Sequence, residues 1–259
     1  MQGLTVFCDF DGPIIDVSDR YYGTYRMSLS KIEQRYEKRG RSLPISPLTK
    51  DQFWSLKQHR VSDVEIALRS GLPKDVIDSF LSCVKSLVNH TDLLHKDRLQ
   101  PNVLWALDYL HSKGIPLVLV TLRCQKQVEE ILRANNLLHL FSNIYGTKDE
   151  GAAYINAAEW KTSLLKKAWH RHLCQYGRPL QSWMIGDTEA DVLAGQAVGI
   201  PTIAVTSGIR SESYLSRFEP TQTCPDVFSA VRYLLHERSW KSHFKQHQYQ
   251  PSISSCPSV

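Results

Sequence analysis

The chain has 259 residues, 42% of them hydrophobic, and a formal net charge of +5. This length and composition suffice for a hydrophobic core, either as one large domain or as one domain with a sizeable insertion. The positive charge is spread along the sequence without a long basic run, so we expect no nucleic-acid partner, and a mild positive balance suits small anionic substrates.

The cysteines and apolar segments bear on the cellular compartment. The six cysteines include no Cys-x-x-Cys pair and no His/Cys spacing of the zinc type, which favours free thiols in a reducing compartment. The first apolar run begins at Leu4, which leaves no room for a signal peptide, and no apolar stretch approaches the roughly 20 residues that cross a bilayer. We therefore expect a soluble cytoplasmic protein without membrane contact.

Short apolar runs alternate with amphipathic stretches along most of the chain. The runs that have the character of buried strands are 4–8, 116–120, 143–145, 183–185 and 202–205. The stretches of helical length between the later runs are 125–135, 160–174 and 189–198. This alternation is typical of parallel strands joined by right-handed crossovers, so we predict an α/β fold with a doubly wound parallel sheet. Ligands of such sheets bind beyond the carboxyl ends of the strands.

The span from about residue 16 to 99 carries no convincing strand and is far too long for a simple crossover. We predict an inserted helical subdomain there. Helices fit 18–38 and 74–88, and sequences of capping-box form begin two more helices at Thr49 and Ser62.

Pro101 and Gly114 delimit a helix that returns the chain to the sheet. The predicted core therefore consists of 1–15 and 100–238. Residues 239–259 are rich in Ser, Gln, His and Lys, and we interpret them as a flexible, solvated tail and their histidines as no metal site.

An acidic pair follows the first apolar run, in Asp9-Phe10-Asp11-Gly12. Alternation along the chain places Asp9 and Asp11 on the same side, while Gly12 allows the backbone to turn. One carboxylate could then attack phosphorus while the other handles a proton. Asp-Gly is equally common as a simple turn after a strand, so this pair does not identify a site by itself.

A second acidic signature, Gly186-Asp187-Thr188-Glu189-Ala190-Asp191, follows the run at 183–185. The spacing of Asp187 and Asp191 places them on one face of a helical turn, although carboxylates at a helix start also simply favour the helix dipole. If the two runs are neighbouring parallel strands, carboxylates from both meet at one sheet edge and need a counter-cation. Oxygen ligands of this type suit Mg²⁺, so the two signatures together predict a magnesium site.

Two further segments are candidates for holding a phosphoryl group. Thr121, Leu122 and Arg123 follow the second apolar run and enter the next helix, where a hydroxyl and free backbone N–H groups make an anion cradle. A lone Thr there is equally consistent with a strand residue or a helix cap. Lys161 is the best candidate for a balancing cation and Lys148 is its rival, although either could be an ordinary surface lysine.

Together these residues resemble the haloacid dehalogenase superfamily, in an order and spacing that cover the chain up to about Leu235. The four family motifs are similar, in turn, to Asp9-Phe10-Asp11-Gly12, Thr121, Lys161 and Gly186-Asp187-x-x-x-Asp191. Two positions depart from the usual pattern, since Pro13 replaces Thr and Thr162 replaces Pro after the lysine. The resemblance implies a Rossmann-like core with a helical cap of the family's first type, which is the insertion of 16–99.

The resemblance also implies roles for these residues. Asp9 would be the nucleophile and Asp11 the general acid/base, and the second aspartate favours the phosphatase branch because the family's dehalogenases lack it and use no metal. Thr121 and Lys161 would hold the phosphoryl oxygens. The ligands of Mg²⁺ would be Asp9, the Asp11 carbonyl and Asp187, with support from Asp191.

We therefore expect a Mg²⁺-dependent phosphomonoester hydrolase that acts on a small phosphorylated metabolite through an aspartyl-phosphate. Candidates for choosing the leaving group are Arg20, Lys57 and Arg60 from the cap and Arg123 from the core; Lys57 and Arg60 are three apart on one predicted helix. A phosphomutase of the same superfamily and a non-catalytic regulatory protein on this scaffold are the alternatives. The sequence leaves the substrate and the oligomeric state open.

Overall fold

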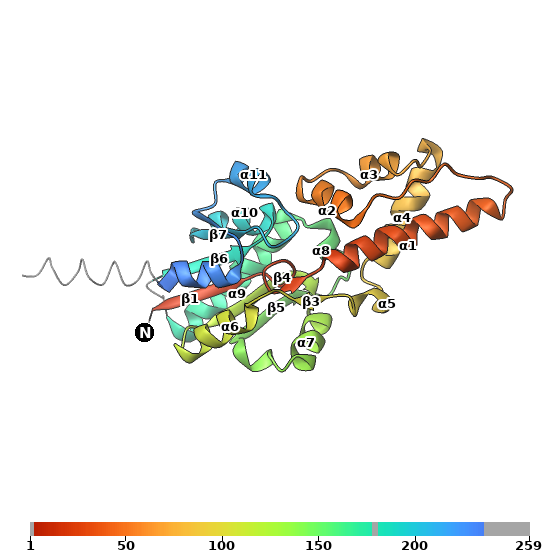
Figure 1. The fold of residues 1–259 in the computed structure, drawn as a ribbon. Helices are drawn as coiled ribbons and strands as arrows, with labels where there is room; N and C mark the ends of the chain where they lie inside the picture. The colour runs from red at the N-terminus through yellow and green to blue at the C-terminus, as the bar shows by residue number, and fades with distance from the viewer. Residues whose placement is uncertain (1–2, 178–180, 236–259) are drawn as a thin grey trace, which may run out of the picture.

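The computed structural model describes residues 3–177 and 181–235 (Figure 1). Six strands form one sheet in the order β5-β4-β1-β6-β7-β8, and every neighbouring pair is parallel. These strands are β1 (Leu4–Cys8), β4 (Leu117–Cys124), β5 (Asn143–Thr147), β6 (Gln181–Gly186), β7 (Thr202–Val205) and β8 (Gln222–Cys224). The predicted doubly wound α/β fold is confirmed, whereas the predicted tail of 239–259 lies outside the described residues.

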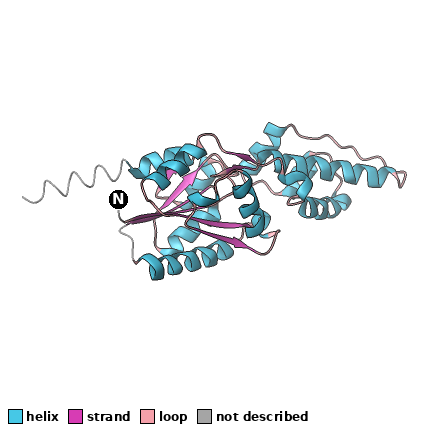
Figure 2. Ribbon diagram, turned by 90° about the horizontal axis from the view of Figure 1, so that it is seen from below, coloured by secondary structure: helices cyan, strands magenta, loops and turns pink. Residues whose placement is uncertain are grey.

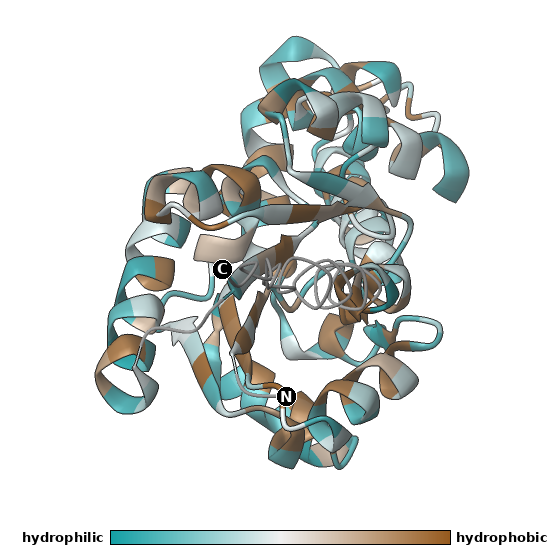
Figure 3. Ribbon diagram, turned by 90° about the vertical axis from the view of Figure 1, so that its left-hand side faces the viewer, coloured by the Kyte–Doolittle hydropathy of each residue, from teal (hydrophilic) through white to brown (hydrophobic). Residues whose placement is uncertain are grey.

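Helices cover both faces of this sheet (Figure 2). One face carries α9 (Ala158–Tyr176) and α10 (Glu189–Val198), and the other carries α6 (Val103–Ser112), α7 (Gln125–Ala134) and helical residues 227–235. Because successive strand residues point to opposite faces, Phe7 of β1 packs toward α9 while its neighbours Val6 and Cys8 pack toward α6 and α7. Both faces are therefore apolar, and the strands are the most hydrophobic part of Figure 3.

The chain between β1 and α6 forms a helical body that extends away from the carboxyl ends of the strands (Figure 1). Its helices are α1 (Ser18–Glu37), α2 (Lys50–Gln58), α3 (Asp63–Arg69), the 3₁₀ turn η1 (Lys74–Val76), α4 (Ile77–Leu87) and α5 (Thr91–Leu94). The expectation of no strand in this span is wrong at its two ends. There β2 (Ile15–Asp16) and β3 (Arg98–Leu99) pair antiparallel, and two residues each are too few to leave a pattern in the sequence.

Aromatic side chains hold this insertion together. Tyr25 of α1 stacks on Phe53 of α2 at 4.8 Å between ring centroids, and its hydroxyl lies 2.7 Å from Ser70 Oγ. Thr49 forms the predicted capping box with Gln52 at the start of α2. The buried apolar side chains of the insertion are continuous with those on one face of the sheet, and this packing lets the insertion present side chains to the sheet edge. In the described part of the chain, no helix is both long and apolar enough to span a bilayer.

A tight loop after β1 joins the sheet to the insertion. The backbone N–H of Ile15 donates to Phe10 O at 3.0 Å, and that of Gly12 donates to Ile15 O at 2.8 Å. Pro13 fits this loop because the turn is closed by the N–H groups of its neighbours. Gly12 has φ +95°, and a Cβ there would clash with the carboxyl group of Asp187, so only glycine allows this approach.

Candidate active site

The two acidic signatures lie at the ends of adjacent strands, as predicted. In the register of β1 and β6, Cys8 is opposite Ile185, and the Asp9 N–H donates to Ile185 O at 2.9 Å. From β1 the chain builds outward through β4 and β5, then returns to β6 on the other side of β1. The strand order reverses at this point, which is where open α/β sheets bind ligands.

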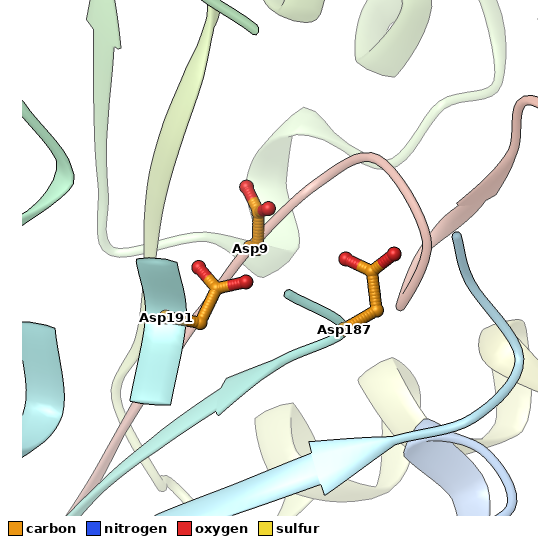
Figure 4. Close-up of side chains that lie close together, drawn as sticks. All are labelled: Asp9, Asp187 and Asp191. Carbon is orange, nitrogen blue, oxygen red and sulfur yellow. The ribbon is translucent and has the colours of Figure 1, made fainter. Parts of the chain in front are cut away.

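Three buried carboxyl groups meet at this edge (Figure 4). One oxygen from each of Asp9, Asp187 and Asp191 lies within 4.8 Å of the other two. Asp187 Oδ2 accepts the Ile209 N–H at 2.7 Å, while Asp187 Oδ1 is buried without a hydrogen-bond partner among the described residues. Burial, with the charges of Asp191 and Asp9, raises the pKa of Asp187 well above its usual value. A hard cation would relieve both the unpaired oxygen and the repulsion.

Lys161 supplies the positive charge inside this cluster. Its Nζ lies 2.8 Å from Asp9 Oδ1 and 2.8 Å from Asp191 Oδ1, and it donates to Val120 O at 3.1 Å. Burial alone would lower the pKa of Lys161, but the carboxylates of Asp191 and Asp9 raise it above its usual value. Burial also raises the pKa of Asp9 to about 7 despite Lys161. Lys148, the rival lysine, is exposed and does not line the pocket described below.

The two carboxylate oxygens of Asp191 make different contacts. Its Oδ2 accepts hydrogen bonds from Thr188 N at 3.1 Å and Thr188 Oγ1 at 2.7 Å, which caps the start of α10. Its Oδ1 faces Lys161 in the acidic cluster. The Asp191 carboxylate therefore stabilises the start of α10 and also belongs to the acidic cluster, so the two interpretations of its position are compatible.

Asp11 lies apart from the three clustered carboxylates, on a pair of arginines. Arg20 Nη2 is 2.9 Å from Asp11 Oδ2, and Arg123 Nη1 is 2.9 Å from Asp11 Oδ1. Asp97 binds the same arginines, at 2.8 Å from Arg20 Nε and 2.7 Å from Arg123 Nη1. Burial alone would raise the pKa of Asp11, but Arg123 and Arg20 hold it below its usual value. This charge quartet connects the insertion to the core, because Arg20 belongs to α1 and Arg123 to β4.

A pocket opens over the clustered carboxylates, between the sheet edge and the insertion. Its volume, counted out to open solvent, is about 570 Å³, which is in the range of small-molecule sites. The residues that line it are Asp9, Asp11, Val17, Tyr21, Lys57, Arg60, Thr121, Leu122, Ala153, Tyr154, Asn156, Lys161, Asp187, Thr188, Ile209 and Arg210. The site is thus built from both parts of the chain.

Comparison with known proteins agrees with this architecture. Residues 6–205 match the family of haloacid dehalogenase-like hydrolases, which is well over half of the chain. The chain belongs to this hydrolase family.

Relatives of the hydrolase include named phosphatases. A phosphoglycolate phosphatase of Aliivibrio fischeri is 33% identical over 138 residues, and the match covers 53% of this chain and 55% of that protein. The pyrophosphatase PpaX of Halalkalibacterium halodurans is 26% identical over 242 residues, covering 89% of this chain and 98% of its own. The chain thus spans about half the length of the first relative and nearly all of the second.

A solved structure shares the hydrolase's fold. A haloacid dehalogenase-like family hydrolase from Streptococcus pneumoniae superposes with a TM-score of 0.63 at 20% sequence identity, over 90% of this chain and 98% of that one.

The segment after the second apolar run differs from the prediction. The strand expected to end at residue 120 continues as β4 to Cys124 with a shifted register against β5, so Thr121, Leu122 and Arg123 lie in this strand and not at a helix start. Helix α7 begins at Gln125, where the predicted helix of 125–135 begins. Thr121 and Leu122 still line the hydrolase's pocket. Arg123 does not, because its guanidinium is buried against Asp11 and Asp97, so the expectation that it contacts substrate is not supported.

Lys57 and Arg60 line the pocket but do not share a helix. Lys57 lies in α2, which ends at Gln58, whereas Arg60 follows in a left-handed turn with φ 60°. The Lys57 ammonium is paired with Asp63 at 2.9 Å, and burial lowers the pKa of Lys57. Arg60 pairs with Glu189 at 3.2 Å, and its side chain remains 43% exposed.

Arg210, Asn156 and Tyr154 are among the residues of the hydrolase's pocket that were not predicted from the sequence. Arg210 is buried and bridges the two parts, with Nε 2.9 Å from Glu189 Oε2 and Nη1 donating to Lys57 O at 3.3 Å. Arg210 follows β7 at the sheet edge that carries Asp9 and Asp187, so its place in the sequence could have identified it as a candidate site residue. Tyr154 lies in the short helix α8 and Asn156 directly follows it, in a segment that carries no motif. The buried Nδ2 of Asn156 has no hydrogen-bond partner among the described residues.

Proposed function

We propose that this hydrolase is a Mg²⁺-dependent phosphomonoesterase that acts on a small phosphorylated molecule through an aspartyl-phosphate on Asp9. The observation that carries the proposal is the placement of Asp9, with Lys161 at 2.8 Å, beside two further buried carboxylates at the end of β1. A carboxylate is a weak nucleophile and needs such a setting to attack a phosphorus atom.

The donor set fits Mg²⁺. The carboxylates of Asp9 and Asp187 and the backbone carbonyl of Asp11 would hold the ion, and Asp187 Oδ1 lacks any other partner in the described structure. Asp191, already bound by Thr188 and Lys161, would support this shell from behind. When bound, the ion would offset the negative charge of the phosphoryl group and of the carboxylates.

In the first half of the proposed reaction, an Asp9 carboxylate oxygen attacks phosphorus. The ester P–O bond breaks as the new bond forms, and the leaving alcohol oxygen receives a proton from Asp11. The Lys161 ammonium and the Thr121 hydroxyl hold the phosphoryl oxygens, with the Leu122 backbone beside them. These groups are fixed before substrate arrives, so little reorganisation accompanies the attack.

In the second half, water attacks the phosphorus of the aspartyl-phosphate. Asp11 takes a proton from that water, inorganic phosphate is released, and the free Asp9 carboxylate is regenerated. Both Asp11 oxygens contact arginines, which can only donate hydrogen bonds. For Asp11 to carry a proton, at least one arginine therefore has to withdraw, and Arg20 can do so if the insertion moves with α1.

We propose that residues 16–99 act as a mobile cap on a core of 1–15 and 100–238. The cap closes the pocket against water and brings Lys57 and Arg60 to the end that faces the leaving group. Arg60 is the cation with an exposed side chain there, so it is our candidate for contacting an anionic leaving group.

The names of the relatives suggest substrates to try first, namely phosphoglycolate and inorganic pyrophosphate. We place the reaction in the cytoplasm, which is reducing, and the five described cysteines are all free thiols.

The decisive experiment measures phosphate release by the purified full chain from phosphoglycolate, from inorganic pyrophosphate, which is an anhydride, and from a panel of other phosphate esters, with Mg²⁺ and with excess chelator. We expect Mg²⁺-dependent release and a phosphoenzyme that hydroxylamine cleaves, as it does acyl phosphates. Isomerisation of a sugar phosphate without phosphate release would instead identify a mutase. Full turnover in chelator would contradict the metal assignment.

A further inference from the structure

Two hollows of the hydrolase share one wall. The wall consists of Tyr21, Lys57 and Tyr154, which line both the pocket over Asp9 and a second, narrow hollow inside the insertion. The other sides of the second hollow are mostly apolar, formed by Phe53, Ile66, Phe80, Val84 and Val88, with Thr24, Tyr25 and Asp63 beside them. The wall therefore separates a charged pocket from mostly hydrophobic space.

This wall is held in place by charge and by ring contacts. The Tyr154 hydroxyl donates to Asp63 Oδ2, and Asp63 Oδ1 accepts from Lys57 Nζ at 2.9 Å. Lys57 Nζ also lies over both rings, at 5.4 Å from the Tyr154 centroid and 5.8 Å from the Tyr21 centroid. Displacing Tyr154 would break its bond to Asp63 and uncover the paired Lys57 ammonium, so the wall resists opening.

The wall includes the part of the pocket that the insertion contributes, because Tyr21 belongs to α1 and Lys57 to α2. The phosphoryl group has to reach Asp9, Lys161 and Thr121 at the sheet edge, so the rest of a substrate extends toward the insertion. Tyr154 comes from α8 (Ala152–Ile155) of the core, so it keeps its position at the sheet edge while bonding to α3 of the insertion.

We propose that Tyr154, fixed by Asp63 and Lys57, is a specificity residue that sets the maximum length of the leaving group. The inference rests on the proposed phosphomonoesterase function. Its consequence is that leaving groups must end at the phenol ring, and that removing the ring would let an alkyl chain continue into the apolar hollow behind it.

The test compares n-alkyl phosphates from ethyl to hexyl by phosphate release. We expect wild-type kcat/KM to fall by about tenfold or more from ethyl to hexyl phosphate, because a chain that meets the wall has no apolar surface to bury. Tyr154→Ala should bring the two values within about twofold of each other, because the added methylenes then enter the hollow. Tyr154→Phe keeps the ring and loses the hydroxyl, and it should keep the wild-type length limit.

A matched control enlarges the hollow without opening the wall. Val84 lines only the second hollow, so Val84→Ala should keep the wild-type dependence on chain length. Loss of the limit in Val84→Ala would overturn the proposal, because the wall would then not be what limits length. Equal wild-type activity on ethyl and hexyl phosphate would overturn it too, and that measurement does not depend on any variant folding.

These outcomes are distinguishable from failure of the proposed function. If wild type releases phosphate from no ester in the panel, the phosphomonoesterase proposal itself fails. If wild type is active and Tyr154→Ala folds but keeps the length limit, only the specificity proposal fails. Thermal unfolding of each variant shows which are folded.

Discussion

The Nζ atom of Lys161 lies 2.8 Å from Oδ1 of Asp9, and both residues are buried. The pair joins the start of α9 to the end of β1 and places a fixed positive charge against the proposed nucleophile. Because the same ammonium also faces Asp191, it offsets repulsion between carboxylates that would otherwise be close and uncompensated.

We therefore predict that Lys161→Met both inactivates and destabilises the hydrolase. Removing one partner of a buried ion pair costs about 3–5 kcal/mol of unfolding free energy, because the remaining charges are left without compensation. Urea unfolding and phosphate release measure the two effects. The control is Lys148→Met at the exposed rival position, which should change stability by no more than about 0.5 kcal/mol. Equal losses in both variants would contradict the assignment.

Replacing the proposed nucleophile should abolish turnover without unfolding the protein. Asp9→Asn keeps the size of the side chain, but the amide cannot attack phosphorus, so we expect a loss of several powers of ten in kcat. Asp11→Asn should lower turnover strongly and still form some phosphoenzyme from an ester with a good leaving group. Near-native turnover by purified Asp9→Asn would exclude this mechanism.

Metal binding can be tested through stability, independently of activity. We predict that Asp187→Asn stabilises the metal-free protein, because it removes a buried charge repelled by Asp191 and Asp9, and that it abolishes stabilisation by Mg²⁺. Each kcal/mol gained in unfolding free energy should raise the Tm by about 2–4 °C for a protein of this size. Differential scanning fluorimetry with chelator and with Mg²⁺ gives both values. A Mg²⁺ shift as large as in wild type would remove Asp187 from the ligand set.

Strands with uniformly apolar sequence were the easiest part of the fold to predict. The bounds of β1 and β7 agree with the predicted runs of 4–8 and 202–205, because buried parallel strands are apolar on both faces. The edge strand β8 was missed, since Gln222 and Thr223 make it polar. The extension of β4 to Cys124 was missed because Thr121 and Arg123 interrupt the apolar run.

The position of the site was predictable from the sequence, but the side-chain contacts of its residues were not. Strand adjacency alone brings Asp9 beside Asp187, and a short motif at each strand end marks them. The contacts of Asp11 with Arg20 and Asp97 depend on how the insertion packs on the sheet, and no spacing in the sequence encodes that. Tyr154 likewise meets Asp63 only through tertiary packing.

The pKa of Asp9 gives a prediction about pH and stability in the metal-free protein. Folding raises this pKa from an ordinary 3.8 to about 7, so the folded state binds the proton more tightly than the unfolded state. The resulting stabilisation is present below about pH 4 and is lost as pH rises through about 7. Unfolding free energy in chelator should therefore fall between pH 5 and pH 7 by up to about 1.4 kcal/mol per unit from this group.

Comparison with Asp9→Asn measures this contribution together with the effect of the Asp9 charge on Asp187, whose pKa it also raises. Burial lowers the pKa of His172, which acts with the opposite sign because the unfolded state then binds the proton more tightly near neutral pH. Both proteins contain His172, so the difference between their unfolding free energies cancels it. A difference that does not change between pH 5 and pH 7 would contradict the raised pKa of Asp9.

Arg60 provides a test of the cap's role in choosing substrates. Lys57 is already neutralised by Asp63, so the arginine is the better candidate for an anionic leaving group. We use Arg60→Gly because glycine adopts the left-handed backbone of this position freely, and it should be more stable than Arg60→Ala by about 1 kcal/mol. Losing a charge-assisted hydrogen bond should raise KM for an ester with a second anionic group by about tenfold, and leave kcat and KM for ethyl phosphate nearly unchanged.

The control is Arg69→Ala, which removes another partly exposed arginine of the insertion that pairs with Glu65 outside the pocket. Equal effects on both esters would show that Arg60 holds the cap on Glu189 rather than selecting the leaving group.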